Sequence, residues 1–370
     1  MRRPWLDCLS VAVAVVVVGS NASALPDVEL GGLAQPQLKW EQQDPDVKPV
    51  VTRSSGFALK RARLIALGRM TTKSVKWEAR LEGEMIPSFQ LLDAYLAATV
   101  ETAGDGMVRI SFGQQWTPFS RQANTLVGDL QMADLAQFQS LVPNRQLGLL
   151  ATLIVPYAPW LQISFGVYNG KGVNVIENLD SNFMYVGRVA LRPMGARAPI
   201  IEGALGPTAI WLAGHFAYNT KNLGDYSETS VQAGADFFAS YRGFSTYVEY
   251  YWGQYTYPST APKQPYKQQG FNAQAGYLLP IPGRLFRRFE LTFRFEAVAP
   301  NQTVPITGPG DPTQARMSIV PGINYYHRGH DLKLQLNYLH NEELDDRDAA
   351  GKIASYKNDS VVFQLVYRLR

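Results

Sequence analysis

The sequence predicts an all-β fold in which sixteen antiparallel strands close into a transmembrane barrel. Three observations lead to this prediction. Segments in which apolar and polar residues alternate recur along most of the chain, and a period of two is typical of strands. Long and short connections alternate between these segments. Only 18% of the residues are charged, against about 25% in a typical soluble domain.

The overall composition excludes several other classes of protein. Hydrophobic residues make up 46% of the chain and the net charge is only +4, so the chain is not disordered. A single cysteine among 370 residues excludes a disulfide scaffold. The mean hydropathy of −0.14 excludes a bundle of membrane-spanning helices. A large soluble β protein and a membrane barrel remain, because barrels have a weak hydropathy signal.

The N-terminus has the features of a secretory signal peptide. Two arginines precede the apolar run Val11–Gly19, and an A-x-A cleavage pattern ends at Ala24. The apolar run is shorter than the roughly 20 residues that a spanning helix needs. We therefore expect residues 1–24, which include the single cysteine Cys8, to be removed, and residues 25–370 to form the exported protein.

One uncharged segment could be mistaken for a membrane helix. Gln146–Gly170 carries no charged residue, but Pro156 and Pro159 lie in its middle. Proline in a helix interior removes a hydrogen bond and clashes with the preceding turn. We therefore predict two strands joined by a tight turn at Pro156–Trp160.

The clearest strands show strict alternation over eight or more residues. In Val75–Glu82, Phe289–Ala297 and Asp331–Tyr338, charged or polar side chains alternate with apolar ones. The chain ends with the same pattern, in which Val361 begins an apolar face. The predicted strands begin near Gly31, Gly56, Ser74, Leu91, Met107, Arg145, Leu161, Phe183, Thr208, Ser230, Phe244, Gly270, Arg288, Ala315, His330 and Asp359.

The connections between these strands favour a barrel over a sandwich. Taken alternately, one set is long and the other short, with two exceptions: a short loop at Pro87–Gln90 and a long turn at Pro193–Pro207. Bacterial outer-membrane barrels combine an even strand number with short periplasmic turns and longer external loops. Closure with about sixteen strands leaves an aqueous channel. The expected location is therefore the bacterial outer membrane.

Six segments follow one another in order over most of the exported chain: GFALKRARLIALG at Gly56–Gly68, Leu92–Tyr95, ISFGQQWTPFSR at Ile110–Arg121, VPNRQLG at Val142–Gly148, VYNGKG at Val167–Gly172 and YVGRVALRP at Tyr185–Pro193. Together they resemble the phosphate-selective porin O and P family. The resemblance implies a sixteen-stranded porin, usually a homotrimer, with a long loop that narrows the channel. The family often ends in an aromatic residue, whereas this chain ends in Leu369-Arg370.

The resemblance also indicates the partners. We expect a passive channel for small ions and hydrophilic solutes, with phosphate as one candidate, embedded in membrane lipid and lipopolysaccharide. Nucleic acid is not expected as a partner.

The connection 116–144 occupies the place of the constriction loop. Its only charges are Arg121, Asp129 and Asp134. Folded into the lumen, they would form an electrostatic step at the narrowest point; folded outward, they would be solvated loop residues. We favour the inward position because so long a loop in a compact domain is usually functional.

The charged faces of the strands are expected to line the lumen. The predicted pore-lining residues are Arg61, Arg63, Lys76, Arg80, Arg109, Arg188, Arg192 and Arg294. Arginine suits an anion because its planar fork donates two hydrogen bonds. Carboxylates share the same faces, however, so the sequence predicts general or weakly anion-preferring diffusion. In Phe57–Leu67, four apolar side chains share the face of Arg61 and Arg63, and the alternation does not decide which face is inside.

The sequence predicts no catalytic residue, metal site or cofactor. His327 and His330 lie in a predicted surface turn without further ligands of the usual kinds nearby. No nucleophile elbow, zinc-binding helix motif or phosphate loop is present. Two alternatives stay open: a barrel-embedded enzyme, for which only His215 and His340 are strand histidines, and a secreted soluble β-sandwich that binds carbohydrate.

Overall fold

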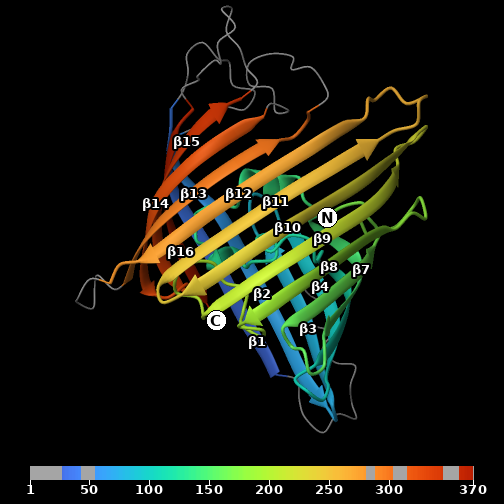
Figure 1. The fold of residues 1–370 in the computed structure, drawn as a ribbon, viewed down its shortest axis with the longest axis horizontal. Helices are drawn as coiled ribbons and strands as arrows, with labels where there is room; N and C mark the ends of the chain where they lie inside the picture. The colour runs from blue at the N-terminus through green and yellow to red at the C-terminus, as the bar shows by residue number, and fades with distance from the viewer. Residues whose placement is uncertain (1–26, 43–54, 281–287, 303–314, 345–357, 370) are drawn as a thin grey trace, which may run out of the picture.

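A single antiparallel sheet closes on itself (Figure 1). The computed structural model describes residues 27–42, 55–280, 288–302, 315–344 and 358–369, so the predicted signal peptide lies outside the described residues. The strands are β1 (Asp27–Glu41), β2 (Gly56–Thr72), β3 (Val75–Glu84), β4 (Gln90–Glu101), β5 (Met107–Trp116), β6 (Arg145–Ile154), β7 (Leu161–Tyr168), β8 (Met184–Met194), β9 (Ala209–Asn222), β10 (Ser227–Tyr241), β11 (Phe244–Thr256), β12 (Tyr266–Leu278), β13 (Phe289–Ala299), β14 (Arg316–Arg328), β15 (Leu332–Glu343) and β16 (Ser360–Leu369).

Every strand pairs with its neighbours in sequence, and β1 closes the barrel by pairing with β16. The closing register runs from Gly32 opposite Leu369 to Glu41 opposite Ser360. Closure matters in a membrane because it leaves no sheet edge with unpaired backbone groups. In Figure 1 the strands of the near wall cross those of the far wall obliquely, as tilted barrel strands do.

The predicted fold class and strand number are confirmed. Each predicted start lies within four residues of the observed one; the largest differences are at β1 and β12, which begin at Asp27 and Tyr266 rather than near Gly31 and Gly270. Gln146–Gly170 forms β6 and β7, as the two prolines indicated. Among the described residues, no helix has the length and apolar character needed to cross a bilayer.

The alternation separates a lipid face from a lumen face. On β13, Leu291 and Phe293 are about half exposed and point outward, whereas Glu290, Arg294 and Glu296 are buried inside. The polar face is therefore inside and the apolar face outside, the reverse of a soluble protein. This excludes the alternative of a soluble sandwich.

A β-bulge decides the facing of β2. The register between β1 and β2 shifts by one residue and leaves Lys60 opposite no residue of β1. Because a shift of one residue exchanges the two faces of a strand, Phe57 and Leu59 point outward and are exposed. Arg61 and Arg63, beyond the bulge, point into the lumen and pair there with polar groups.

The connections sort to the two ends of the barrel, with the two predicted exceptions. The β3–β4 connection, residues 85–89, is short, and the β8–β9 connection, residues 195–208, is long. Two connections enter the lumen: residues 117–144 between β5 and β6, and residues 195–208 between β8 and β9. The first carries two short 3-10 helices, η1 (Val127–Asp129) and η2 (Gln137–Ser140), and lies between the walls in Figure 1.

Candidate functional site: the lumen constriction

The constriction loop, residues 117–144, packs against the inner wall through two phenylalanines. Phe119 and Phe138 are fully buried. Their rings contact Tyr251 of β11, with centroids 6.1 and 6.3 Å away. Tyr168 of β7 belongs to the same buried cluster. Apolar side chains on the lumen face, exceptions to the outward rule, therefore form a small core that exists only because the loop covers it.

Hydrogen bonds to side chains of the wall fix the loop along β11 to β15. Glu249 on β11 accepts from the hydroxyl of Ser120 at 2.9 Å. Glu296 on β13 accepts from the N–H of Gln137 at 3.1 Å, and Asn337 on β15 from the N–H of Ala133 at 2.8 Å. The polar residues of this wall satisfy loop groups that would otherwise be buried without partners.

The three loop charges all lie inside the barrel, in different surroundings. Asp129 pairs with Arg368 at 2.8 Å and Asp134 with Lys60 at 2.9 Å. Arg121 has no described carboxylate within salt-bridge distance; its guanidinium lies 3.8 Å above the ring of Phe238 and donates to the carbonyl of Ile201 at 3.0 Å. Its Nε and Nη1 have no hydrogen-bond partner among the described residues.

A cavity of about 130 Å³ separates the loop from β6, β7 and β8. Its wall carries three guanidinium groups, three hydroxyl groups and, among the described residues, no carboxylate. The lining residues are Pro118, Ser120, Arg121, Asn124, Leu150, Thr152, Gln162, Ser164, Arg188, Ala190, Arg192, Ile200 and Trp211. This constriction cavity therefore presents hydrogen-bond donors and positive charge.

The two strand arginines of the cavity are held differently. Arg188 pairs with Asp236 at 2.7 Å and donates to the carbonyl of Phe119 at 2.7 Å, so it ties β8 to β10 and to the loop. Arg192 lies 4.4 Å from the ring of Trp211, and no described carboxylate pairs with it. Its Nε is buried and has no hydrogen-bond partner among the described residues.

The other predicted pore-lining residues lie on the lumen face in ion pairs. Arg63 bridges Glu82 and Glu84 at 2.9 and 2.8 Å. Arg80 pairs with Glu82 at 2.5 Å and Arg109 with Glu78 at 2.8 Å. These pairs form a nearly neutral wall on β2 to β5.

Three predicted positions stand apart from the constriction cavity. Arg61 donates to Gln35 at 2.9 Å. Lys76 lies at the short-turn end, exposed and paired with Glu101. Arg294 is buried beneath the loop, where it donates to the carbonyl of Asp134 at 2.7 Å.

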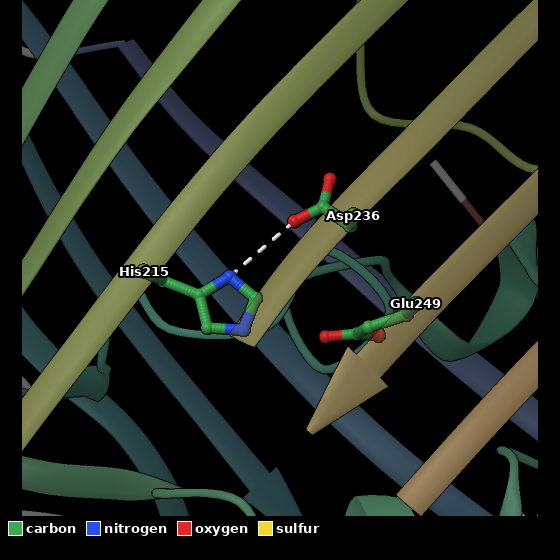
Figure 2. A group of neighbouring side chains, drawn as sticks. All are labelled: His215, Asp236 and Glu249. Atoms are coloured by element: carbon green, nitrogen blue, oxygen red, sulfur yellow. Dashed lines mark ion pairs between the residues drawn. The ribbon is translucent and has the colours of Figure 1, made fainter. Parts of the chain in front are cut away.

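A histidine and two carboxylates lie together on three adjacent strands (Figure 2). His215 on β9, Asp236 on β10 and Glu249 on β11 place one possible ligand atom each within 4.8 Å of one another. The group does not fit a metal ion, because Arg188 already pairs with Asp236 and approaches His215 Nδ1 at 3.3 Å. Phe119 covers the imidazole at 4.2 Å between ring centroids. The cluster anchors Arg188 and the loop.

Sequence reasoning missed three residues of this site: Glu202, Trp211 and Asp236. Trp211 and Asp236 lie on lumen faces that alternation could have identified. Glu202 lies in a connection and has no such signal. His330, predicted at a surface turn, is instead buried beside Tyr326, because its side chain turns into the barrel end.

Comparison with known families supports the resemblance in the second half of the chain. Residues 215–369 match the family model described as Phosphate-selective porin O and P. The segments quoted from the sequence lie before residue 194, so the family model and those segments cover different parts of the chain. No curated protein sequence matches this chain.

The solved structures compared with this chain are outer-membrane proteins of similar fold. A trimer form of OmpT from Vibrio cholerae superposes with a TM-score of 0.60 at 10% identity, covering 93% of this chain and 99% of that one. An anion-selective porin from Comamonas acidovorans gives 0.58 at 12% identity, with 93% and 99% covered. The outer membrane channel DcaP of Acinetobacter baumannii gives 0.58 at 14%, with 93% and 97% covered. At such identities the likeness shows the fold.

Proposed function

We propose that this chain, a porin of the bacterial outer membrane with a partial match to the phosphate-selective porin O and P family, prefers small anions among the hydrophilic solutes that diffuse through it. The observation that supports this selectivity is the constriction cavity: its wall carries Arg121, Arg188 and Arg192 and no described carboxylate. Rings or clusters of one charge at a constriction set the selectivity of a pore.

The placement of the acidic residues strengthens this proposal. Asp236 lies behind Arg188, and Glu249 accepts hydrogen bonds from loop residues, so neither carboxylate lines the cavity. An anion entering the cavity meets the guanidinium of Arg192, with which no described carboxylate pairs, together with the hydroxyls of Thr152 and Ser164. Such donors suit phosphate or a carboxylate.

The test is the reversal potential of single channels in a planar bilayer across a potassium chloride gradient. We expect discrete conductance steps with an anion-type reversal potential for the purified protein. Arg192→Gln should reduce the chloride-to-potassium permeability ratio about tenfold, since one charge at about 6 Å in water attracts chloride and repels potassium by roughly 0.7 kcal/mol each.

Lys263→Gln is the matched control. Lys263 is exposed in the β11–β12 connection, so its loss removes the same charge away from the cavity and should leave the ratio unchanged. An unchanged ratio in Arg192→Gln would contradict the cavity as selectivity site, and a cation-type reversal potential in the parent would overturn anion preference.

We also propose that the porin assembles as a homotrimer and contacts lipopolysaccharide through its outer rim. The trimer form of the structurally similar OmpT supports the first part, and the external loops expected of such barrels support the second. Light scattering of the protein in detergent distinguishes a monomer from a trimer.

A further inference from the structure

A second segment enters the lumen, from the end opposite the constriction loop. Residues 195–208, here called the periplasmic insert, join β8 to β9 at the short-turn end, which is periplasmic in bacterial barrels. Its base is exposed at Arg197, whereas its tip at Glu202, Gly203 and Ala204 is buried. Only a segment that folds inward buries its middle in this way.

The tip of the insert reaches across the lumen to the opposite wall. The N–H of Ala204 donates to Glu290 of β13 at 2.7 Å. Gly203 has a φ of +87°, and a Cβ there would lie 3.1 Å from the hydroxyl of Tyr326 on β14. The insert therefore extends from β8 and β9 to β13 and β14, and a glycine is required at the closest approach.

The insert and the constriction loop are joined by hydrogen bonds at Glu202. Its N–H donates to the carbonyl of Asp129 at 3.1 Å. Its carboxylate accepts from the N–H of Gln131 at 3.0 Å and from the Gln122 amide at 3.1 Å. The neighbouring carbonyl of Ile201 accepts from Arg121 at 3.0 Å. Hydrogen bonds to a buried charge are among the stronger ones.

The result is an asymmetric lumen. On β12, whose side chains face the insert and the loop, Asn272 has no exposed surface. On the other side, the lumen-facing side chains of Glu78 and Arg109 are 22% and 27% exposed. Water therefore reaches Glu78 and Arg109 on the β2–β5 wall, whereas Asn272 is covered by protein.

We infer that the periplasmic insert is a second constriction element, with Glu202 as the positioning residue. Its hydrogen bonds hold the constriction loop in place from the periplasmic side, and this set of contacts is here called the latch. Through Ile201 and Glu202 it holds Arg121 at the constriction cavity and confines solutes to the side of the lumen next to β2–β8. This inference rests on the proposed channel function.

Glu202→Ala tests the latch by conductance. It would leave the Gln131 N–H and the Gln122 amide without their acceptor, so the loop should separate from the insert. We expect a larger unit conductance, more closing events and a reversal potential shifted toward zero, because Arg121 loses its fixed position. Glu202→Gln, which keeps one acceptor oxygen, should show a smaller shift of each.

Asp225→Ala is the matched charge control, since Asp225 is exposed in the β9–β10 connection. It should reproduce the parent channel. Identical single-channel records for Glu202→Ala and the parent would overturn the latch while leaving the porin function intact. Absence of any conductance steps in the parent would instead contradict the proposed function.

Thiol accessibility tests the insert without relying on conduction. The single cysteine of the chain, Cys8, lies in the predicted signal peptide, so an introduced cysteine is the sole reporter. Ala204→Cys should react at least about tenfold more slowly with a charged, water-soluble thiol reagent than Leu205→Cys, because the buried site needs local opening. Adding Glu202→Ala should remove the difference. Equal rates in the parent background would show that the tip does not insert.

Discussion

At the scale of single residues, the lumen contains two kinds of arginine. Arg63, Arg80 and Arg109 each lie within 3 Å of a carboxylate, so their charges are largely cancelled. Arg121 and Arg192 pair with no described carboxylate, so their positive charge is not cancelled by an ion pair and can attract an anion. Net charge per wall, rather than the number of arginines, therefore decides where an anion is attracted.

Asp180 provides a residue-scale prediction for pH. It lies in the β7–β8 connection; burial raises its pKa, but hydrogen bonds from the N–H of Asn222, from Lys171 and from the N–H of Asn182 outweigh this and lower the pKa to about 2. Unfolded aspartate has a pKa of about 3.9. The folded pKa is the lower one, so the contact stabilises the connection at any pH above about 4 and is lost as the pH falls from about 4 to 2.

Hydrogen exchange of residues 178–183 checks this expectation. Protection, corrected for the intrinsic rate, should be equal at neutral pH and pH 5 and should fall near pH 2. Asp180→Asn should show reduced protection at every pH. Protection lost already at pH 5 in the parent would contradict the lowered pKa.

At the scale of elements, the contact between the constriction loop and the wall depends on a small residue in β12. A Cβ on Gly270 would lie 2.3 Å from the Cβ of Phe138, so Gly270→Ala must displace η2. Overpacking of this kind costs about 1–3 kcal/mol. We expect a lower midpoint of unfolding in detergent and a wider distribution of single-channel conductance.

Gly214→Ala is the corresponding control, since a Cβ at Gly214 on β9 meets nothing within 4 Å. The midpoints of thermal unfolding of both variants in detergent, followed by circular dichroism, test this prediction. Equal midpoints for the two alanine variants would mean that the loop does not pack against β12 as described.

At the scale of the whole molecule, selectivity depends on fixed charges in a water-filled lumen and should therefore depend on salt. The screening length is about 10 Å at 0.1 M salt and about 3 Å at 1 M. For gradients of the same ratio, the anion preference should be stronger at the low-salt end and approach zero reversal potential at the high-salt end. A preference that does not change with salt would indicate selection by size or by direct binding alone.

The sequence by itself determined the barrel. Alternation requires only that one face meets lipid and the other water, and this condition acts on each strand independently, so sixteen strands could be located from local pattern. The two proline positions in Gln146–Gly170 likewise act locally, and they correctly separated β6 from β7.

Only the tertiary structure decided what happens inside the lumen. The facing of β2 depends on one extra residue, Lys60, which is recognised only against the register of β1. The periplasmic insert was visible in the sequence as an unusually long turn, but its position depends on Glu202 meeting loop residues more than 70 positions away. Contacts of this kind leave no periodic signal, because each joins groups that the chain brings together only after the barrel closes.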